Sequence, residues 1–307
     1  MTSFLPEGKR MNTAENLSAI AGCEGLRSAM EQGRILEARA TLCDHAHNLL
    51  VDLGSIRGVI PREEGAMGIR EGRVRDIALI SRVGKAVCFT VKELKKEDGG
   101  MTAILSRAEA QRQCSAKYLS TLVAGDVIPA KVTHMEPFGA FCDIGCGIVA
   151  LMPIDTISVS RIEHADERFT VGMDIFAVVK AKADNRITLS HKELLGTWEQ
   201  NAARFSVGDT VTGVIRSIEN YGAFVELTPN LAGLAELKDN IHIGDTAAVY
   251  IKSILPQKMK IKLIIIDNFY EPHTPCAPEY CITAGHIERF DYSPVECDKT
   301  IYTDFGP

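Results

Sequence analysis

The sequence lacks any long uninterrupted apolar run. Its richest apolar stretch, IKLIIID at 261–267, is much shorter than the ~20 residues that a membrane-spanning helix needs. The first residues, MTSFLPEGKRMNTAEN, also lack the apolar segment that follows the basic start of a secretory signal. We therefore expect a cytoplasmic protein that has no membrane partner.

Closely spaced cysteine pairs are absent as well. The nine cysteines run from Cys23 to Cys297, and an odd number without paired spacing predicts free thiols in a reducing compartment. The last 40 residues do gather histidines and cysteines, but without the close cysteine pair that structural zinc sites use. The residues in question are His273, Cys276, Cys281, His286 and Cys297. We predict no metal site and expect the aromatic residues of EYCITAGHIERFDYSP, at 279–294, to pack against the last folded repeat.

Common catalytic signatures are missing too. The chain has no Gly-Lys-Ser phosphate loop, dinucleotide glycine fingerprint, His-Glu-x-x-His or Gly-x-Ser-x-Gly. The neighbouring acids Glu63 and Glu64 lie on a predicted loop, where a solvated surface explains them better than acid–base chemistry. The sequence thus predicts a protein that is not an enzyme, with no cofactor and no small-molecule substrate.

Positive charge is in short supply over the whole chain. The net charge is −6, and the segment 268–307 holds seven acids and two bases, which account for −5 of it. The remainder is close to neutral, so any cationic surface must be local and confined to one face.

What the sequence does contain is a repeat. AGDVIPAKVTHMEPFGAFCDIG at 124–145 aligns without a gap on VGDTVTGVIRSIENYGAFVELT at 207–228. Each copy continues into further alternating apolar runs, five in all, separated by Gly, Pro, Asn and Asp, which indicate five strands and a small closed barrel. A weaker third copy, EARATLCDHAHNLLVDLGSIRGVIPREE, begins at Glu37.

The segments around the repeats are predicted to be helical. AENLSAIAGCEGLRSAMEQG ends on Gly33, and two similar connectors precede the second and third copies, the second of them carrying Trp198, which we expect to pack between repeats. We predict a mainly β protein of three tandem five-stranded barrels with short connecting helices. Its predicted segments are an N-terminal helical part at 1–36, a degenerate repeat at 37–117, full repeats at 118–200 and 201–267, the latter shortened, and an acidic extension at 268–307.

Period-two alternation predicts which residues face outward. In GAFVELT, Phe224 shares its face with Glu226 and Thr228, and in the preceding copy Phe141 shares its face with Asp143. Phe138 and Tyr221 lie three residues earlier, and the intervening glycines, Gly139 and Gly222, permit a bend that returns them to the same side. Each copy should therefore present two aromatic rings on a hydrophilic surface.

Cations occupy outward positions on the last two strands of each full repeat. These residues are Lys180, Arg186, Lys252, Lys260 and Lys262. Aromatic rings beside cations suit single-stranded nucleic acid, because bases stack on rings and phosphates need neutralising charge. The alternative is that the aromatics are ordinary half-buried caps, but the same pair in two copies favours binding.

The second and third copies resemble the RNA-binding OB-fold repeat of the bacterial ribosomal protein S-one family. That repeat has FGAF on its second strand and RIRLS on its fifth, and this chain has FGAF at 138–141 and RITLS at 186–190. The resemblance covers about 36–267 and is weakest in the first copy. It implies single-stranded RNA lying across strands two, three and five, with contacts from Phe138, Phe141, Arg186, Tyr221, Phe224 and Lys260.

The chain also departs from the family pattern. The strand-three histidine is replaced by Pro61, Pro153 and Glu236. The first copy has HNLL for FGAF, which leaves His47 as its stacking candidate, and Thr102 where the arginine should be. We expect the first copy to keep the fold without the RNA contacts.

The expected function is non-catalytic binding of single-stranded RNA or mRNA in bacterial translation or mRNA handling, with the small ribosomal subunit as a further partner. Two alternatives remain open. The array is a ribosome- or protein-docking module with little RNA affinity, or it is the non-catalytic arm of an RNA-processing enzyme whose catalytic chain is separate.

Overall fold

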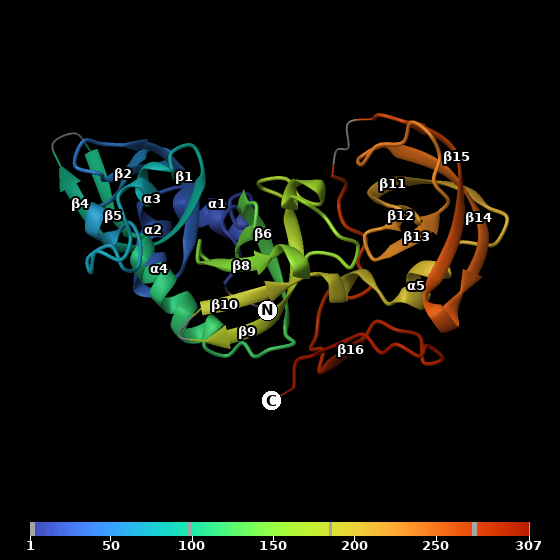
Figure 1. Cartoon of the computed structure of the whole chain (residues 1–307). Coiled ribbons are helices and arrows are strands. Elements are labelled where there is room, and N and C mark those ends of the chain that lie inside the picture. The colour runs from blue at the N-terminus through green and yellow to red at the C-terminus, as the bar shows by residue number, and fades with distance from the viewer. Residues whose placement is uncertain (1–3, 98–99, 184–185, 272–274, 307) are drawn as a thin grey trace. The chain divides into compact units, whose positions relative to one another are not determined.

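The computed structural model describes residues 4–97, 100–183, 186–271 and 275–306. In these ranges it contains three closed barrels of five strands each, which confirms the predicted mainly β fold class (Figure 1). The chain divides into two compact units, Met1–Leu122 with Asp143–Val149, and Val123–Cys142 with Ala150–Pro307. No helix in the described part of the chain is long and apolar enough to cross a membrane.

The first unit begins with the expected helical segment. Helix α1 (Ala14–Ile20) is capped by Thr13, whose hydroxyl accepts a hydrogen bond from the backbone N–H of Asn16 at 3.2 Å. Helix α2 (Cys23–Glu31) is followed by Gly33, whose φ of +59° lets the chain leave the helix. Leu26 of α2 is fully buried in the core of the first barrel.

The first barrel has the strand order β1-β2-β3-β5-β4, and β3 and β5 run parallel. Its strands are β1 (Leu36–Cys43), β2 (Leu49–Leu53), β3 (Ile56–Ile60), β4 (Ala86–Glu97) and β5 (Gly100–Ser106). The short helices η1 (Arg62–Glu64) and α3 (Ile77–Ile80) lie between β3 and β4. Helix α4 (Arg107–Cys114) and the π-helical turn η2 (Ser115–Leu119) form the connector that leaves the barrel.

The second barrel follows the same plan, with the order β10-β8-β7-β6-β9. Its strands are β6 (Val127–Glu136), β7 (Gly139–Asp143), β8 (Val149–Pro153), β9 (Asp174–Ala183) and β10 (Arg186–Ser190). The short helices η3 (Ile154–Thr156) and η4 (Ala165–Glu167) lie between β8 and β9. Residues 143–149, which connect β7 to β8, group with the first unit.

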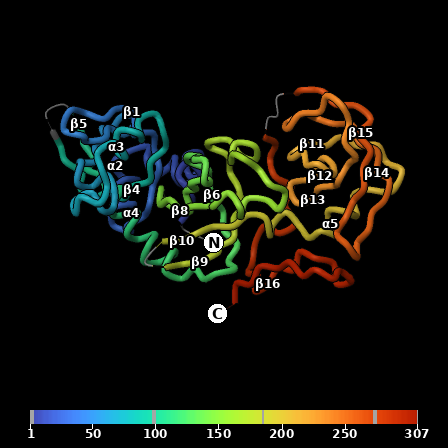
Figure 2. The backbone as a smooth tube through the Cα atoms, in the orientation of Figure 1, coloured from blue at the N-terminus to red at the C-terminus, as the bar shows by residue number. Residues whose placement is uncertain are grey.

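The third barrel has the order β11-β12-β13-β15-β14, and its backbone closes on itself in Figure 2. It is reached through η5 (Lys192–Leu195) and α5 (Trp198–Ala202). Its strands are β11 (Thr210–Glu219), β12 (Gly222–Thr228), β13 (Leu231–Ala235), β14 (Thr246–Leu255) and β15 (Lys260–Phe269), with η6 (Pro256–Lys258) joining the last two. Trp198 is buried among apolar residues of both flanking barrels, including Val178 and Ile215, as expected of a residue that packs between repeats.

The acidic extension carries a small hairpin, β16 (Arg289–Asp291) with β17 (Tyr302–Asp304). Its residues Phe290 and Tyr292 join the apolar cluster of the third barrel, as predicted. Tyr280 is also packed against this cluster, and its ring lies 5.3 Å between centroids from that of Phe176 on β9 of the second barrel. The hydroxyl of Tyr280 also accepts the backbone N–H of Phe176, so hydrogen bonding as well as apolar burial fixes its position.

Candidate nucleic-acid interface

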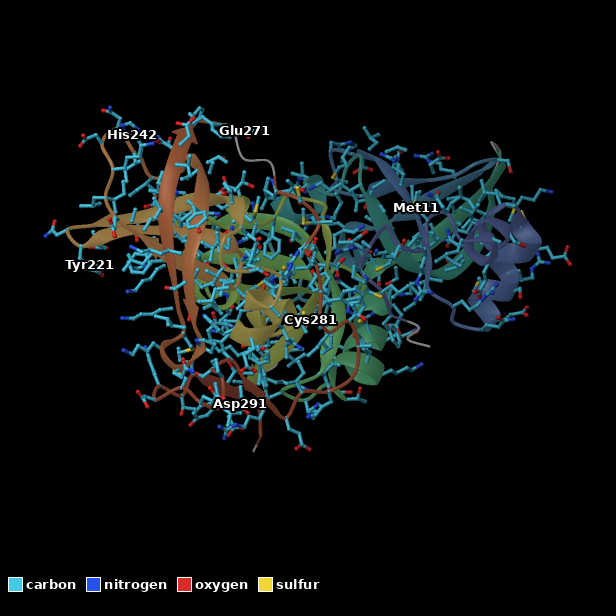
Figure 3. The ribbon with its side chains drawn as sticks, turned by 90° about the vertical axis from the view of Figure 1, so that its right-hand side faces the viewer. Met11, Tyr221, His242, Glu271, Cys281 and Asp291 are labelled. Atoms are coloured by element: carbon cyan, nitrogen blue, oxygen red, sulfur yellow. The ribbon has the colours of Figure 1, made fainter. Side chains whose placement is uncertain are left out.

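Both full repeats place two aromatic rings together at the outer end of a hairpin. The ring centroids of Phe138 and Phe141 are 6.0 Å apart, and those of Tyr221 and Phe224 are 6.2 Å apart. In each pair the rings are almost perpendicular, at 88° and 89°, an edge-to-face arrangement that aromatic pairs favour. Phe138 is 55% exposed and Tyr221 is 68% exposed, and Tyr221 lies on the outside of the third barrel in Figure 3. The predicted pairing of aromatics therefore occurs in both repeats.

Glycine backbone geometry makes these pairs possible. Gly139 and Gly222 adopt φ values of +152° and +154°, which L-residues rarely adopt. A Cβ atom on Gly139 would lie 2.2 Å from the carbonyl oxygen of Met152, and one on Gly222 would lie 2.5 Å from that of Ala235. Only glycine allows the hairpin to approach the next strand so closely while turning the preceding aromatic toward its partner.

In the third barrel a lysine lies in the same cross-strand row as the inner aromatic ring. Phe224 on β12 pairs with Leu234 on β13, and Leu234 pairs in turn with Lys262 on β15. These three residues form a row across adjacent strands, which places Lys262 two strand spacings, roughly 10 Å, from Phe224. Lys260 is exposed two residues earlier on the same strand face. The exposed Lys252 on β14 has its ammonium 3.9 Å from the carboxylate of Glu236.

Among the described residues, the second barrel has no cation in the corresponding row and carries its charge two residues earlier on the strand. Thr188 of β10 pairs with Leu151 of β8 and so takes the place that Lys262 has in the third barrel. Arg186 takes the place of Lys260 and is exposed, as is Lys180 on β9.

A histidine that the sequence analysis did not include among the candidate contacts lies beside the aromatic pair of the second repeat. The ring of His134 stacks on Phe141 at 6.2 Å between centroids and 21° between planes, and its Nε2 lies 2.6 Å from Glu136. His134 aligns with Ser217, which pairs directly with Phe224 in the third barrel. Counting the strand register outward from the hairpin would have found it.

The first barrel lacks this aromatic and cationic surface at the corresponding row. Leu50 pairs with Val59, and Val59 pairs with Ile104, so the row is aliphatic throughout. His47, the predicted stacking candidate, has its Nδ1 3.6 Å from a carboxylate oxygen of Asp76. Thr102, at the position of the family arginine, is 6% exposed.

The polar residues of β12 that were expected on the hydrophilic surface are instead buried. Glu226 is 7% exposed and accepts hydrogen bonds from Arg168 and Arg216. Thr228 is equally buried and donates to the side-chain oxygen of Asn201 at 2.7 Å. This part of the alternation prediction is wrong because segments distant in sequence cover the outward face at the end of the strand.

Asp143 at the end of β7 shows the same effect in the first unit. It is 2% exposed and accepts the backbone N–H of Glu7 at 2.7 Å and that of Gly145 at 2.8 Å. Burial, together with the negative charge of Glu7, raises the pKa of Asp143 to about 7.

The histidines and cysteines of the extension do not gather into a ligand set in the described ranges. His286 has its Nδ1 2.8 Å from a carboxylate oxygen of Asp126, Cys281 is exposed, and His273 lies outside the described residues. No group of three His, Cys, Asp or Glu side chains among the described residues is arranged to hold a metal ion.

Comparison with known proteins agrees with these features. The family model "S1 RNA binding domain" matches residues 121–192. "Small ribosomal subunit protein bS1" of Staphylococcus aureus strain COL is 32% identical over 252 residues, which are 79% of this chain and 61% of that protein. The resemblance to the ribosomal protein S-one family is confirmed. The bS1 protein of Staphylococcus haemolyticus strain JCSC1435 is 31% identical over 255 residues, with 80% and 61% of the two chains covered.

The chain thus spans 61% of the length of these S-one relatives. Among solved structures, a multidomain protein with nucleic acid binding domains from Streptococcus pneumoniae TIGR4 aligns over 78% of this chain and 75% of its own, at 13% identity and a TM-score of 0.26. The S1 match includes both FGAF at 138–141 and RITLS at 186–190, so the aromatic pair of the second repeat and Arg186 lie inside the matched segment.

Proposed function

We propose that this protein binds single-stranded RNA through its second and third S-one-type repeats and acts in translation or mRNA handling without catalysing a reaction. The observation that carries this proposal is the repeated aromatic pair, with ring separations of 6.0 and 6.2 Å and an exposed outer ring in both repeats. The exposed outer ring of each pair contributes little to a core, whereas unstacked bases bind to such rings.

Positive charge near the aromatic pairs supports an RNA strand, rather than an isolated base, as the ligand. In the third repeat the row from Phe224 through Leu234 to Lys262 combines a ring, an apolar step and a cation over roughly 10 Å. That span fits a base stacked at one end and a phosphate neutralised at the other. We propose as RNA contacts Phe138, Phe141, Lys180, Arg186, Tyr221, Phe224, Lys252, Lys260 and Lys262, with His47 as the weaker candidate of the first repeat.

The setting of the protein is proposed on the same basis. The bS1 relatives are named as proteins of the small ribosomal subunit, which supports that subunit as a partner and the cytoplasm as the location. The five segments at 1–36, 37–117, 118–200, 201–267 and 268–307 remain our proposed domain division. Neither a cofactor, a metal ion nor a membrane has a part in this function.

A docking role is the second candidate, and the first repeat favours it. Its row of Leu50, Val59 and Ile104 is aliphatic where the other repeats have aromatics or cations. An aliphatic row is better suited to contact a partner protein than a charged RNA strand. We propose that the first repeat contributes little to RNA affinity.

Fluorescence anisotropy with a labelled, 5′-hydroxyl, uridine-rich RNA tests the proposed function. We expect micromolar binding to the single strand and much weaker binding to a duplex of the same length. Arg186→Gln and Lys260→Gln should each flatten the logarithmic salt dependence by about 0.7, because each neutralises one phosphate of a single strand. Lys299→Gln in the extension is the matched control and should leave the slope unchanged. If the wild type retains no single-stranded RNA at low salt, the docking role replaces RNA binding as the function.

A further inference from the structure

The first unit contains a pocket with a cavity volume of about 460 Å³, well within the size range of small-molecule sites. It is lined by the N-terminal segment, by the residues that follow α2 and by the connector after the first barrel. Arg10, Arg34 and Lys117 bring positive charge to its wall, and Glu15 is the one acid among the lining residues. The wall therefore carries a net charge of +2 in a chain whose overall charge is −6.

The arginines of this pocket have donors that no group among the described residues satisfies. The Nε and one terminal nitrogen of Arg10, and the Nε of Arg34, are buried and have no hydrogen-bond acceptor among the described residues. Arg34 does use another nitrogen to donate to Glu15 at 3.0 Å. Buried donors are almost always paired, so these three nitrogens favour an anionic acceptor as their partner.

The main chain holds both arginines in place. The backbone N–H of Arg10 donates to a carboxylate oxygen of Glu37 at 2.9 Å, and its carbonyl accepts the N–H of Thr13 at 2.9 Å. The backbone N–H of Arg34 donates to the carbonyl of Ala29 at 2.9 Å. The backbone of both arginines is thus ordered before a ligand binds, which lowers the entropic cost of binding.

The chemistry of the wall identifies the ligand class. A guanidinium presents a planar fork of donors that matches the oxygens of a phosphate group. The ring of Phe4 also lines the pocket, and it is stacked on Tyr118 at 6.1 Å and 12°, which gives an apolar wall beside the cations. We propose that this pocket binds a phosphate monoester, carried either by a mononucleotide or by the 5′ end of an RNA.

Isothermal titration calorimetry on the full chain tests this site with four probes. These are inorganic phosphate, AMP, and a hexauridylate RNA with either a 5′-phosphate or a 5′-hydroxyl. We expect AMP to bind with a Kd below about 1 mM, and the double variant Arg10→Gln with Arg34→Gln to weaken that binding about ten-fold or more. Arg27→Gln, which removes an exposed cation from α2, is the matched control and should bind AMP as the wild type does.

A second variant keeps the test decisive if the double variant fails to fold. Arg10→Lys retains the charge but loses the fork, so it should weaken AMP binding several-fold while leaving the melting temperature close to that of the wild type. The proposal is overturned if no phosphate-bearing probe saturates the protein up to about 10 mM, or if folded arginine variants bind AMP as tightly as the wild type.

The arms also separate the two sources of phosphate and separate this site from the RNA surface. Preference for the 5′-phosphorylated over the 5′-hydroxyl RNA, lost in Arg10→Lys, assigns the pocket to RNA ends, whereas equal RNA binding with retained AMP binding assigns it to mononucleotides. The double variant Phe141→Ala with Phe224→Ala should weaken both RNAs and leave AMP binding intact. Failure of the proposed RNA-binding function and failure of the phosphate site are therefore distinguishable.

Discussion

Glu226 is the residue whose loss should destabilise the second unit most clearly. Its carboxylate accepts from Arg168 and from Arg216, the latter through Nε at 2.9 Å and through a second nitrogen at 3.3 Å. Glu167 also pairs with Arg216. The side chains of Arg168 and Glu226 are each 7% exposed, so solvent screens their interaction little.

The size of the effect follows from this burial. Removing one partner of a buried ion pair costs about 3–5 kcal/mol, because the other charge is left without compensation. Glu226→Ala leaves two buried arginines with only Glu167 between them. Burial already lowers the pKa of Arg168, which indicates that its charged form is held there at a cost. We expect a loss of about 3 kcal/mol and a fall in Tm of about 6–12 °C for a unit of this size.

Differential scanning calorimetry measures this loss, and Glu236→Ala is the matched control. Glu236 is 86% exposed, and its carboxylate lies 3.9 Å from the ammonium of Lys252 at the surface of the same barrel. Loss of such a pair should change the stability by less than about 0.5 kcal/mol. Equal melting of the Glu226→Ala and Glu236→Ala variants would refute the claim that this network is buried and structural.

Three further outcomes are expected. Burial lowers the pKa of His191 to about 4, below its usual 6.5, so the unfolded chain binds the proton first as the pH falls. The free energy of unfolding should therefore fall by about 2–3 kcal/mol between pH 6.5 and 4. Thermal melts in acid should show that His191→Gln flattens this dependence. Gly139→Ala should cost more than about 2 kcal/mol in thermal melts, whereas Gly172→Ala, where a Cβ has open space, should cost only about 1. His47→Ala should change the affinity for 5′-hydroxyl RNA less than about two-fold, and a larger loss in anisotropy would assign the first repeat an RNA contact.

The fold and the aromatic pairs could be predicted because local patterns determine them. Alternation along each strand identifies its inward face, and glycine between two aromatics identifies the bend that brings the rings together. The helical ends, the five-strand repeats and the pairing of Phe138 with Phe141 depend on residues close in sequence.

The predictions that were wrong concern features that residues distant in sequence determine. Asp143 was assigned to the surface, yet the backbone of Glu7, far away in the sequence, covers it. Glu226 is covered by Arg168 in the same way. Alternation states which way a side chain points from its strand, but it does not state what packs on that side. The pocket around Arg10 and Lys117 could not be predicted for the same reason, because its lining residues lie far apart in the sequence of the first unit.

The most direct test of the account is RNA binding by the double variant Phe141→Ala with Phe224→Ala. Stacking on an aromatic contributes about 1–3 kcal/mol per base, so each single variant should bind the uridine-rich RNA roughly five-fold or more weakly, and the double variant should lose more than either. Tyr302→Ala, which removes an exposed ring of the extension, is the control and should bind as the wild type does. Anisotropy titrations paired with thermal melts give both quantities. A double variant that melts and binds like the wild type would show that the rings only cap their barrels, and it would contradict the proposed RNA surface.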